Sequence, residues 1–248
     1  MIGISTANDP MQRDLFVYFA RKGYTCVEYN HRFTPFFLSE NRLKHLKACM
    51  EKYNLTITFH SDANDLCHPD RLVADSQLML LKSEMWFANR LGIKHIVFHL
   101  PKYLDTQEIL IDTVLKELCE TATGYGVALY LENDSRGPWA DPHNVRAILD
   151  RHPLRHCLDT GHLNNAINAG ITDMDTHFKL LGERMDYLHL HDNDGKSDQH
   201  IGLGKGNIDL KYLFSKIDNV EPSILIIETH DMKDAAITRD MLSSFGYD

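Results

Sequence analysis

The amino-acid sequence predicts an α/β protein folded as a single (β/α)8 TIM barrel over residues 1–248. Short apolar runs alternate with longer amphipathic stretches along the whole chain, a pattern typical of parallel strands joined by crossover helices. The length suits a closed barrel of this kind. Ionisable residues also close most of the later apolar runs, at the strand ends where such barrels place their sites.

Eight strands are expected, each a short run of buried type. The first two are brief, and later ones end in a polar residue, as in TITFH, HIVFH, ALYLE and ILIIE. The expected strand ranges are 2–4, 26–29, 56–60, 95–99, 127–132, 156–159, 186–191 and 223–228.

Eight amphipathic helices are expected to follow these strands in turn. Gly23 and Gly92 each stand between a helical pattern and a strand, where helices end. No stretch is rich enough in Pro, Gly or Ser to link two domains, so we expect one. The expected helix ranges are 11–22, 40–53, 69–91, 106–125, 142–151, 173–181, 210–216 and 233–245.

Composition narrows the class of protein. Hydrophobic residues make up 43% of the chain, enough for a substantial core. The five cysteines form no CxxC pair, which favours reduced thiols in a cytoplasmic protein. The N-terminal residues do not resemble a signal peptide, and no apolar run reaches the ~20 residues of a membrane span. The net charge of −9 argues against general attraction to nucleic acid.

Six metal-ligand side chains close successive strands, from the third to the eighth: His60, His99, Glu132, Asp159, His189 and Glu228. Burying an ionisable group at the end of an apolar strand is costly unless a partner neutralises it. Taken singly, each histidine is more simply a hydrogen-bonded structural residue. At equivalent ends of one barrel, however, the six converge on one face. Imidazole and carboxylate together favour zinc, manganese or iron.

Two loop motifs add further donors. Asp159-Thr-Gly-His162 places an imidazole just beyond a strand end, and we expect Gly161 to allow a sharp turn there. Asp198-Gln-His200 lies in the long, glycine-containing stretch 192–209 and can hold one ion from one side. The alternative for this second motif is an ordinary solvated loop.

The motifs CLDTGH, LEND, HLHDND and DQHIGLGKGNI, with single histidines ending two strands, resemble the xylose isomerase-like TIM barrels, and among them most closely endonuclease IV, the class II AP endonucleases. The resemblance implies nine ligands for three zinc ions. His60 and His99 would hold one ion, and Glu132 would bridge it to a second. The second ion would be completed by Asp159, His189 and Glu228, and a third would be held by His162, Asp198 and His200.

Departures from that pattern bear on the substrate. The residues after His60 read Ser-Asp-Ala-Asn-Asp, small and acidic where endonuclease IV carries an aromatic DNA-gripping side chain. The family's DTCH reads DTGH, its HLND reads HLHD, and this chain is shorter. We therefore expect this protein to share the metal chemistry but to lack a surface for duplex DNA. DNA as the substrate is kept only as a weaker alternative.

Four further residues are predicted to touch substrate: Glu28, His191, Lys196 and Trp139. Glu28 closes the second strand and is equally well explained as a salt-bridged residue. Alternation along the seventh strand turns His191 inward with His189, so it competes with that residue as a ligand. Exposed lysines such as Lys196 usually have no specific role, and Trp139 lies in the loop after the fifth strand.

Three functions are compatible with these residues. The first hypothesis is a phosphoester hydrolase that holds two to three zinc or manganese ions and acts on a small phosphorylated or sugar-containing substrate, with Glu132 and Glu228 as catalytic residues. The alternative is a sugar or sugar-phosphate isomerase or epimerase with one ion, in which the same two glutamates move a proton. The third is a non-catalytic metal-binding barrel. Association into a homo-oligomer is left open.

Overall fold

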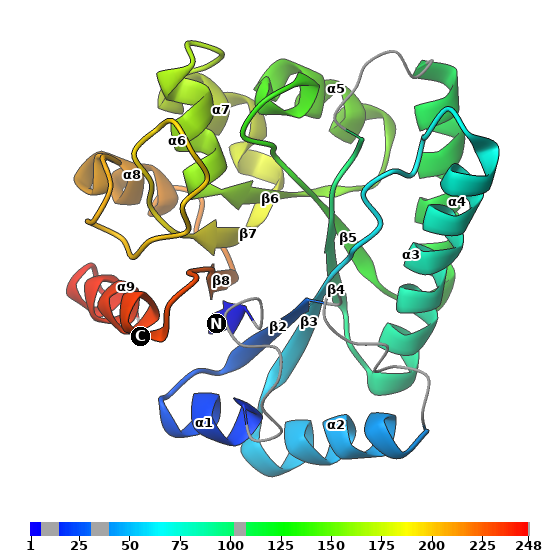
Figure 1. Ribbon diagram of the computed structural model, residues 1–248, viewed down its shortest axis with the longest axis horizontal. Coiled ribbons are helices and arrows are strands. Elements are labelled where there is room, and N and C mark those ends of the chain that lie inside the picture. The colour runs from blue at the N-terminus through cyan, green and yellow to red at the C-terminus, as the bar shows by residue number, and fades with distance from the viewer. Residues whose placement is uncertain (6–14, 31–39, 102–107, 248) are drawn as a thin grey trace.

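The computed structural model describes residues 1–5, 15–30, 40–101 and 108–247. Eight parallel strands form a closed barrel in chain order, with β1 hydrogen-bonded to both β2 and β8 (Figure 1). The eight predicted strands are therefore confirmed. Their bounds are β1 Ile2–Ser5, β2 Cys26–Asn30, β3 Thr56–His60, β4 His95–Phe98, β5 Ala128–Glu132, β6 Arg155–Asp159, β7 Met185–Leu190 and β8 Ile224–Ile227.

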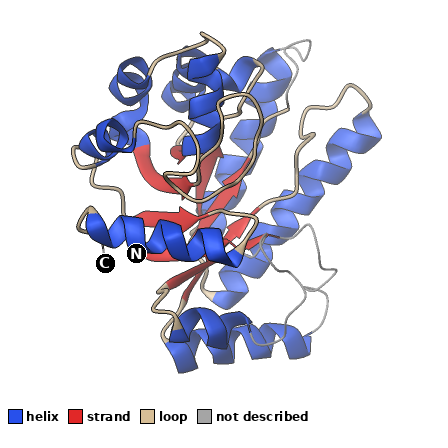
Figure 2. Ribbon diagram, turned by 60° about the vertical axis from the view of Figure 1, so that its left-hand side comes forward, coloured by secondary structure: helices blue, strands red, loops and turns tan. Residues whose placement is uncertain are grey.

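Helices surround these strands, as Figure 2 shows. The eight predicted helices are all present, although residues 11–14 and 106–107 of two of them lie outside the described residues. The bounds are α1 Leu15–Arg21, α2 Glu40–Tyr53, α3 Arg71–Leu91, α4 Glu108–Tyr125, α5 Pro142–Arg151, α6 Thr160–Asn168, α7 Met174–Leu181, α8 Leu210–Ile217 and α9 Met232–Ser244, with short 3-10 turns η4 Pro138–Ala140 and η5 Gly182–Arg184.

Helix α6 was not predicted, and it changes the account of the DTGH motif. Asp159 is its N-cap, and its carboxylate accepts a 2.6 Å hydrogen bond from the backbone N–H of His162. The sharp turn expected at Gly161 was wrong, because this glycine lies in the first helical turn. A side chain at Gly161 would overlap the imidazole of His191, so the glycine serves close packing.

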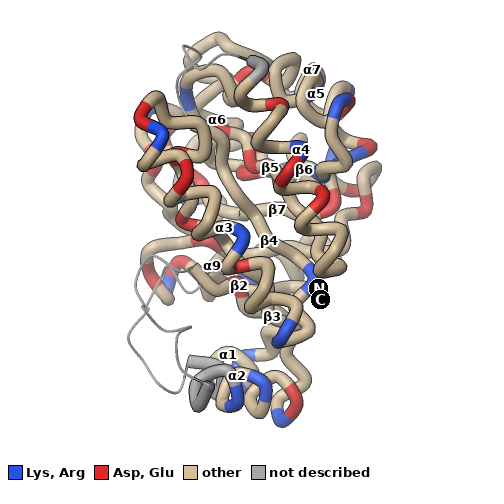
Figure 3. Tube along the Cα trace, turned by 90° about the vertical axis from the view of Figure 1, so that its right-hand side faces the viewer, with Lys and Arg blue, Asp and Glu red and all other residues tan. Residues whose placement is uncertain are grey.

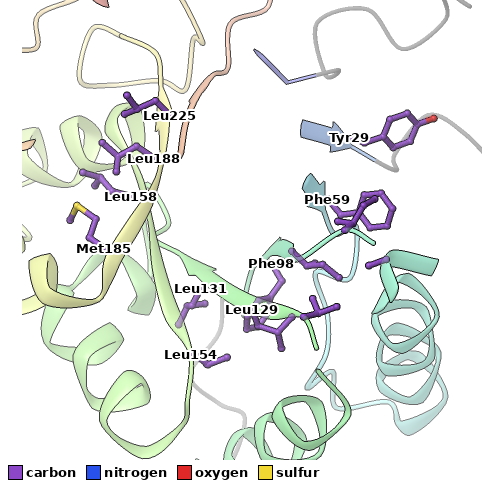
Figure 4. Packing of buried hydrophobic residues seen from close by; sticks show 14 of the residues in the cluster. Tyr29, Phe59, Phe98, Leu129, Leu131, Leu154, Leu158, Met185, Leu188 and Leu225 are labelled. Carbon is purple, nitrogen blue, oxygen red and sulfur yellow. The ribbon is translucent and has the colours of Figure 1, made fainter. Parts of the chain in front are cut away.

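The core has two layers separated by the barrel wall. A small cluster fills the barrel interior. A larger one lies between the strands and the helices, and Figure 4 shows part of it. Alternation along β6 places Cys157 in the interior and Leu158 outside. The interior cluster consists of Cys26, Val97, Tyr130, Cys157, Tyr187, Ile224 and Ile226.

The outer surface is mixed in charge. Lys and Arg are interspersed with Asp and Glu along the helices on the face shown in Figure 3. All five cysteines are buried, and none of them forms a disulfide. Among the described residues, no helix combines the length and apolar character that a membrane crossing requires.

Candidate metal centre at the barrel mouth

The predicted donors meet at the carboxyl ends of the strands. The strands β3, β5 and β6 end in His60, Glu132 and Asp159, and β7 carries His189. His99 and Glu228 directly follow β4 and β8. The donors form three groups, and within each group one donor atom per residue lies within 4.8 Å of the others. The groups are His60, Glu132 and His189; Glu132, Asp159, His189 and Glu228; and His191, Asp198 and His200.

The largest group, the four-donor group, surrounds one nitrogen of His189. Its Nδ1 lies 3.0 Å from Oε2 of Glu228, 3.4 Å from Oε1 of Glu132 and 3.9 Å from Oδ2 of Asp159. All four side chains are buried. Nδ1 nevertheless makes no hydrogen bond, although it is fully enclosed. A buried donor set aimed at one unsatisfied nitrogen is the arrangement that a bound cation completes.

Electrostatics support the same conclusion. Burial opposes ionisation of Glu228, but the charge of His189 outweighs it and lowers the pKa of the carboxyl. Burial also disfavours charge on His189, yet the surrounding anionic groups, Glu28, Glu228 and Glu132 among them, hold its pKa well above the ordinary value. Without a metal, protons on the imidazoles supply the positive charge that these carboxylates require. Three carboxylates and an imidazole fit manganese or zinc well.

Glu132 belongs to the four-donor group and also contacts two more histidines. Its Oε2 lies 3.0 Å from Nε2 of His60 and 3.3 Å from Nε2 of His99, whereas its Oε1 faces His189. Burial alone lowers the pKa of His60, but the hydrogen bond and charge of Glu132 raise it to about 9. The carboxylate thus has one oxygen on each side, as the bridging position implied by the resemblance requires.

The third group differs from the predicted one. Oδ2 of Asp198 lies 3.2 Å from Nε2 of His162 and 3.1 Å from Nε2 of His200, as expected. His191 joins them: its ring stacks on His200 with 4.0 Å between centroids, and its Nε2 lies 3.0 Å from both oxygens of Asp159. This residue, predicted as a substrate contact or as a ligand competing with His189, is fully buried among the donors of the third group.

Asp192 fixes the loop that carries Asp198 and His200. Its backbone pairs with Ile201, and its carboxylate accepts hydrogen bonds from the backbone N–H groups of Asn193 and Gly204 at 2.9 and 3.0 Å. Sequence reasoning gave Asp192 no role, although its place in the HLHDND motif was the available signal.

Asn133 was also missed. Its side chain accepts from the backbone N–H of Asp159 at 2.8 Å and donates to the carbonyl of the same residue at 3.2 Å. It therefore ties the end of β5 to the end of β6. The signal was its position directly after Glu132 in the LEND motif.

The other three residues predicted to touch substrate lie outside the three donor groups. Trp139 is 3% exposed, and its indole N–H donates to the carbonyl of Pro101 at 2.7 Å, joining the loops after β4 and β5. Lys196 is exposed, and its backbone carbonyl accepts from Arg136 at 2.7 Å. Glu28 lies below the mouth, fully buried, with Oε2 2.7 Å from Nε2 of His189.

Comparison with known proteins assigns the family. The family described as xylose isomerase-like TIM barrel matches residues 16–245. The protein belongs to this family. Among its relatives, an uncharacterized protein of Methanocaldococcus jannaschii is 26% identical over 226 residues, which are 84% of this chain and 76% of that protein. Fructoselysine 3-epimerase of Escherichia coli O157:H7 is 22% identical over 205 residues, 75% of this chain and 72% of the enzyme.

Solved structures of xylose isomerase-like proteins share the fold. A D-tagatose 3-epimerase-like protein superimposes with a TM-score of 0.86 at 20% identity, over 98% of this chain and 96% of that one. The IOLI protein with a bound zinc atom gives a TM-score of 0.81 at 16% identity, over 98% and 94%. The nearer resemblance to endonuclease IV stays a prediction.

Proposed function

We propose that this protein is a metal-dependent sugar isomerase or epimerase, which moves a proton at a carbon next to a carbonyl group. The four-donor group carries the proposal, because Glu132 at the end of β5 and Glu228 after β8 both approach Nδ1 of His189, at 3.4 and 3.0 Å. Relatives and neighbours named as 3-epimerases support it. The alternative that we placed second therefore agrees better with the comparisons than phosphoester hydrolysis does.

The residues divide the chemistry between them. A divalent cation held by Glu132, Asp159, His189 and Glu228 would polarise the carbonyl and its neighbouring hydroxyl, acidifying the intervening C–H bond. One of the two glutamates takes the proton from one face of that carbon, and the other returns a proton. The barrel interior below them is closed by Tyr187 and Tyr130, both fully buried, so bulk water is excluded from that side.

Sugar hydroxyls are expected to meet the histidines at the rim. The side chains of His60, His99 and His162 are 9, 16 and 12% exposed, so each presents an edge to the mouth while its other side contacts a carboxylate. The ring nitrogens of His60 and His162 already face protein oxygens, so a polyol would meet the exposed ring edges beside the carboxylates.

Solvent exchange tests the proposal directly. Protein loaded with manganese or zinc is incubated in D2O with ketohexoses, ketose phosphates and a fructosamine, and deuterium at the carbon next to the carbonyl is measured by NMR. We expect Glu228→Gln to lower exchange by roughly 10²-fold or more, because it removes the carboxylate that moves the proton. Glu183→Gln, on an exposed carboxylate in η5 paired with Arg146, is the matched control and should exchange normally. A metal-loaded wild type that exchanges no proton in any of these sugars contradicts the proposal.

Phosphoester hydrolysis is the second candidate, favoured by the additional group formed by His191, Asp198 and His200. Proton transfer at carbon has no need of a second ion, whereas phosphoryl transfer uses clustered ions to stabilise the attacking and leaving oxygens. Elemental analysis of protein purified without chelator separates the two. About three ions per chain, with phosphate release and no deuterium exchange, would favour hydrolysis. Metal with neither reaction would favour a binding protein.

A further inference from the structure

A continuous chain of hydrogen bonds crosses the barrel interior below the metal centre, from β3 to β7. Thr58 Oγ1 lies 2.7 Å from the hydroxyl of Tyr187, which donates to Oε2 of Glu28 at 2.7 Å. Nε2 of His189 reaches the same oxygen at 2.7 Å. Thr58, Tyr187, Glu28 and His189, the interior hydrogen-bond chain, are each 0% exposed.

The direction of each hydrogen bond follows from the groups involved. An ionised carboxylate only accepts, so Oε2 of Glu28 receives one hydrogen from Tyr187 and one from Nε2 of His189. Tyr187 has a single hydroxyl hydrogen, so its oxygen must accept from Thr58. His189 is thereby fixed with a hydrogen on Nε2, and the other ring nitrogen, Nδ1, faces Glu132 and Glu228.

We propose that Glu28, supported by Tyr187 and Thr58, is the positioning residue that makes Nδ1 of His189 a metal donor. Rotation of the imidazole, or a shift of its hydrogen to Nδ1, would break the 2.7 Å bond to Glu28. A carboxylate behind a ligating histidine fixes the ring and increases its basicity. The inference rests on the proposed function in one respect, since it assumes an ion at the four-donor group.

Packing alone does not explain a glutamate at this position. The side chain is fully buried, and the residues paired with it in the neighbouring strands, Ser5 and Thr58, carry no charge. A carboxylate in such surroundings costs free energy unless it is paired, and Oε1 of Glu28 makes no hydrogen bond. An apolar residue would fill the same space without that cost. What the carboxylate adds is its bond to His189.

Tyr130 provides a matched control in the same interior cluster. Its ring lies 5.2 Å from that of Tyr187, it is also 0% exposed, and its hydroxyl is hydrogen-bonded to Nδ1 of His95 at 2.9 Å. Tyr130→Phe and Tyr187→Phe therefore remove equivalent buried hydroxyls with a similar cost to packing. Only the second loses a contact in the interior hydrogen-bond chain.

The test is metal affinity without substrate, measured by competition with a chelator for manganese and zinc. His189→Ala first identifies which ion is lost with that ligand. We expect Glu28→Gln to weaken binding of this ion by about 10–100-fold, the usual effect of removing a partner behind a ligand. Tyr187→Phe should weaken it by less, Thr58→Val by less again, and Tyr130→Phe should match the wild type. Thermal unfolding confirms that each variant is folded.

Three outcomes would overturn the inference. One is equal affinity of Tyr187→Phe and Tyr130→Phe, whether both are unchanged or both are reduced. Another is unchanged affinity in a folded Glu28→Gln protein, and the third is a wild type that binds no ion through His189. If Glu28→Gln does not fold, the two tyrosine variants decide. If the variants show the expected order of metal affinities but the wild type exchanges no proton in any sugar, the result would count against the proposed function and not against this inference.

Discussion

Gly161 leaves free the space that the imidazole of His191 fills. The imidazole of His191 packs directly on the glycine in the first turn of α6, and its Nε2 contacts both oxygens of Asp159 at 3.0 Å. Both positions depart from the endonuclease IV motifs DTCH and HLND. The smaller residue at one position makes room for the larger one at the other, which brings an added imidazole to the third donor group.

This packing predicts a strong effect of one methyl group. Gly161→Ala should destabilise the protein by about 1–3 kcal/mol, as overpacking of a filled site does. Gly124→Ala is the matched control, because Gly124 also lies in a helix, α4, but an added methyl group meets nothing within 4 Å. Urea unfolding measures both.

A variant of His191 provides a second test of the packing at Gly161. When His191→Ala is already present, the cost of Gly161→Ala should fall, because the obstructing ring has been removed. Strictly additive free energies of unfolding in the double variant would contradict the packing account.

The loop 192–209 is held by backbone hydrogen bonds and carries two of the donors, Asp198 and His200. Asp192 satisfies backbone N–H groups from both ends of this loop, including that of Ile208 at 3.3 Å. Gly206 lies so close to the Asn193 carbonyl that a side chain would overlap it. The loop backbone therefore helps to position Asp198 and His200, and the 2.9 Å contact between Nδ1 of His200 and the Glu228 carbonyl also fixes the second residue.

Asp192→Asn should loosen this loop. An amide N–H2 group would face a backbone N–H, at a cost of about 1–3 kcal/mol. We expect faster hydrogen exchange across residues 193–207 and weaker binding of the ion held by Asp198 and His200. Asp209→Asn is the control, because Asp209 caps α8 through Tyr212 and asparagine caps equally well. Unchanged exchange in the Asp192 variant would show that the loop is held by other contacts.

Helix α6 illustrates what the sequence pattern could not reveal. Its residues, TGHLNNAIN, are mostly polar and small, so no apolar periodicity marks them. The helix forms because its asparagines are used inside the protein: Asn164 donates to Asn193 at 2.8 Å and to Asn207 at 2.6 Å. These partners come from the loop 192–209, which local propensity does not encode.

For the whole molecule, the strands and the donors at their ends were predictable, because parallel strands bring equivalent positions to one face. The pairing of donors was not. Whether Glu28 meets substrate or His189, and whether His191 joins Asp198, depends on side-chain direction and on the depth of each residue in the barrel. Sequence order carries no information about either.

Stability should also depend on a pair of histidines on the outer side of the barrel wall, where Nδ1 of His156 lies 3.0 Å from the carbonyl oxygen of Leu131. Nε2 of His156 lies 3.1 Å from Nε2 of His177, and both rings are buried between β6 and α7. Burial lowers the pKa of His156 to about 4 and that of His177 well below its usual value. Because the unfolded chain binds these protons more readily, the stability is present above pH ~6.5 and is lost as the pH falls towards 4.

The comparison with His156→Gln isolates this effect. The variant should be the less stable protein at pH 7, but its deficit should shrink by about 3 kcal/mol between pH 6.5 and 4, since the wild type alone must protonate His156 at a buried site. Chemical unfolding at several pH values measures the difference. A deficit that stays constant with pH would show that His156 does not titrate between the two states.

The closure of β1 against β8 has a consequence for how the protein matures. Glu228 directly follows β8, whereas its partner His189 lies in β7, and the other two members of the four-donor group, Glu132 and Asp159, end earlier strands. During synthesis, the earlier carboxylates and imidazoles emerge before the residue that completes their set. We therefore expect the four-donor group to bind an ion only after β8 has joined the barrel.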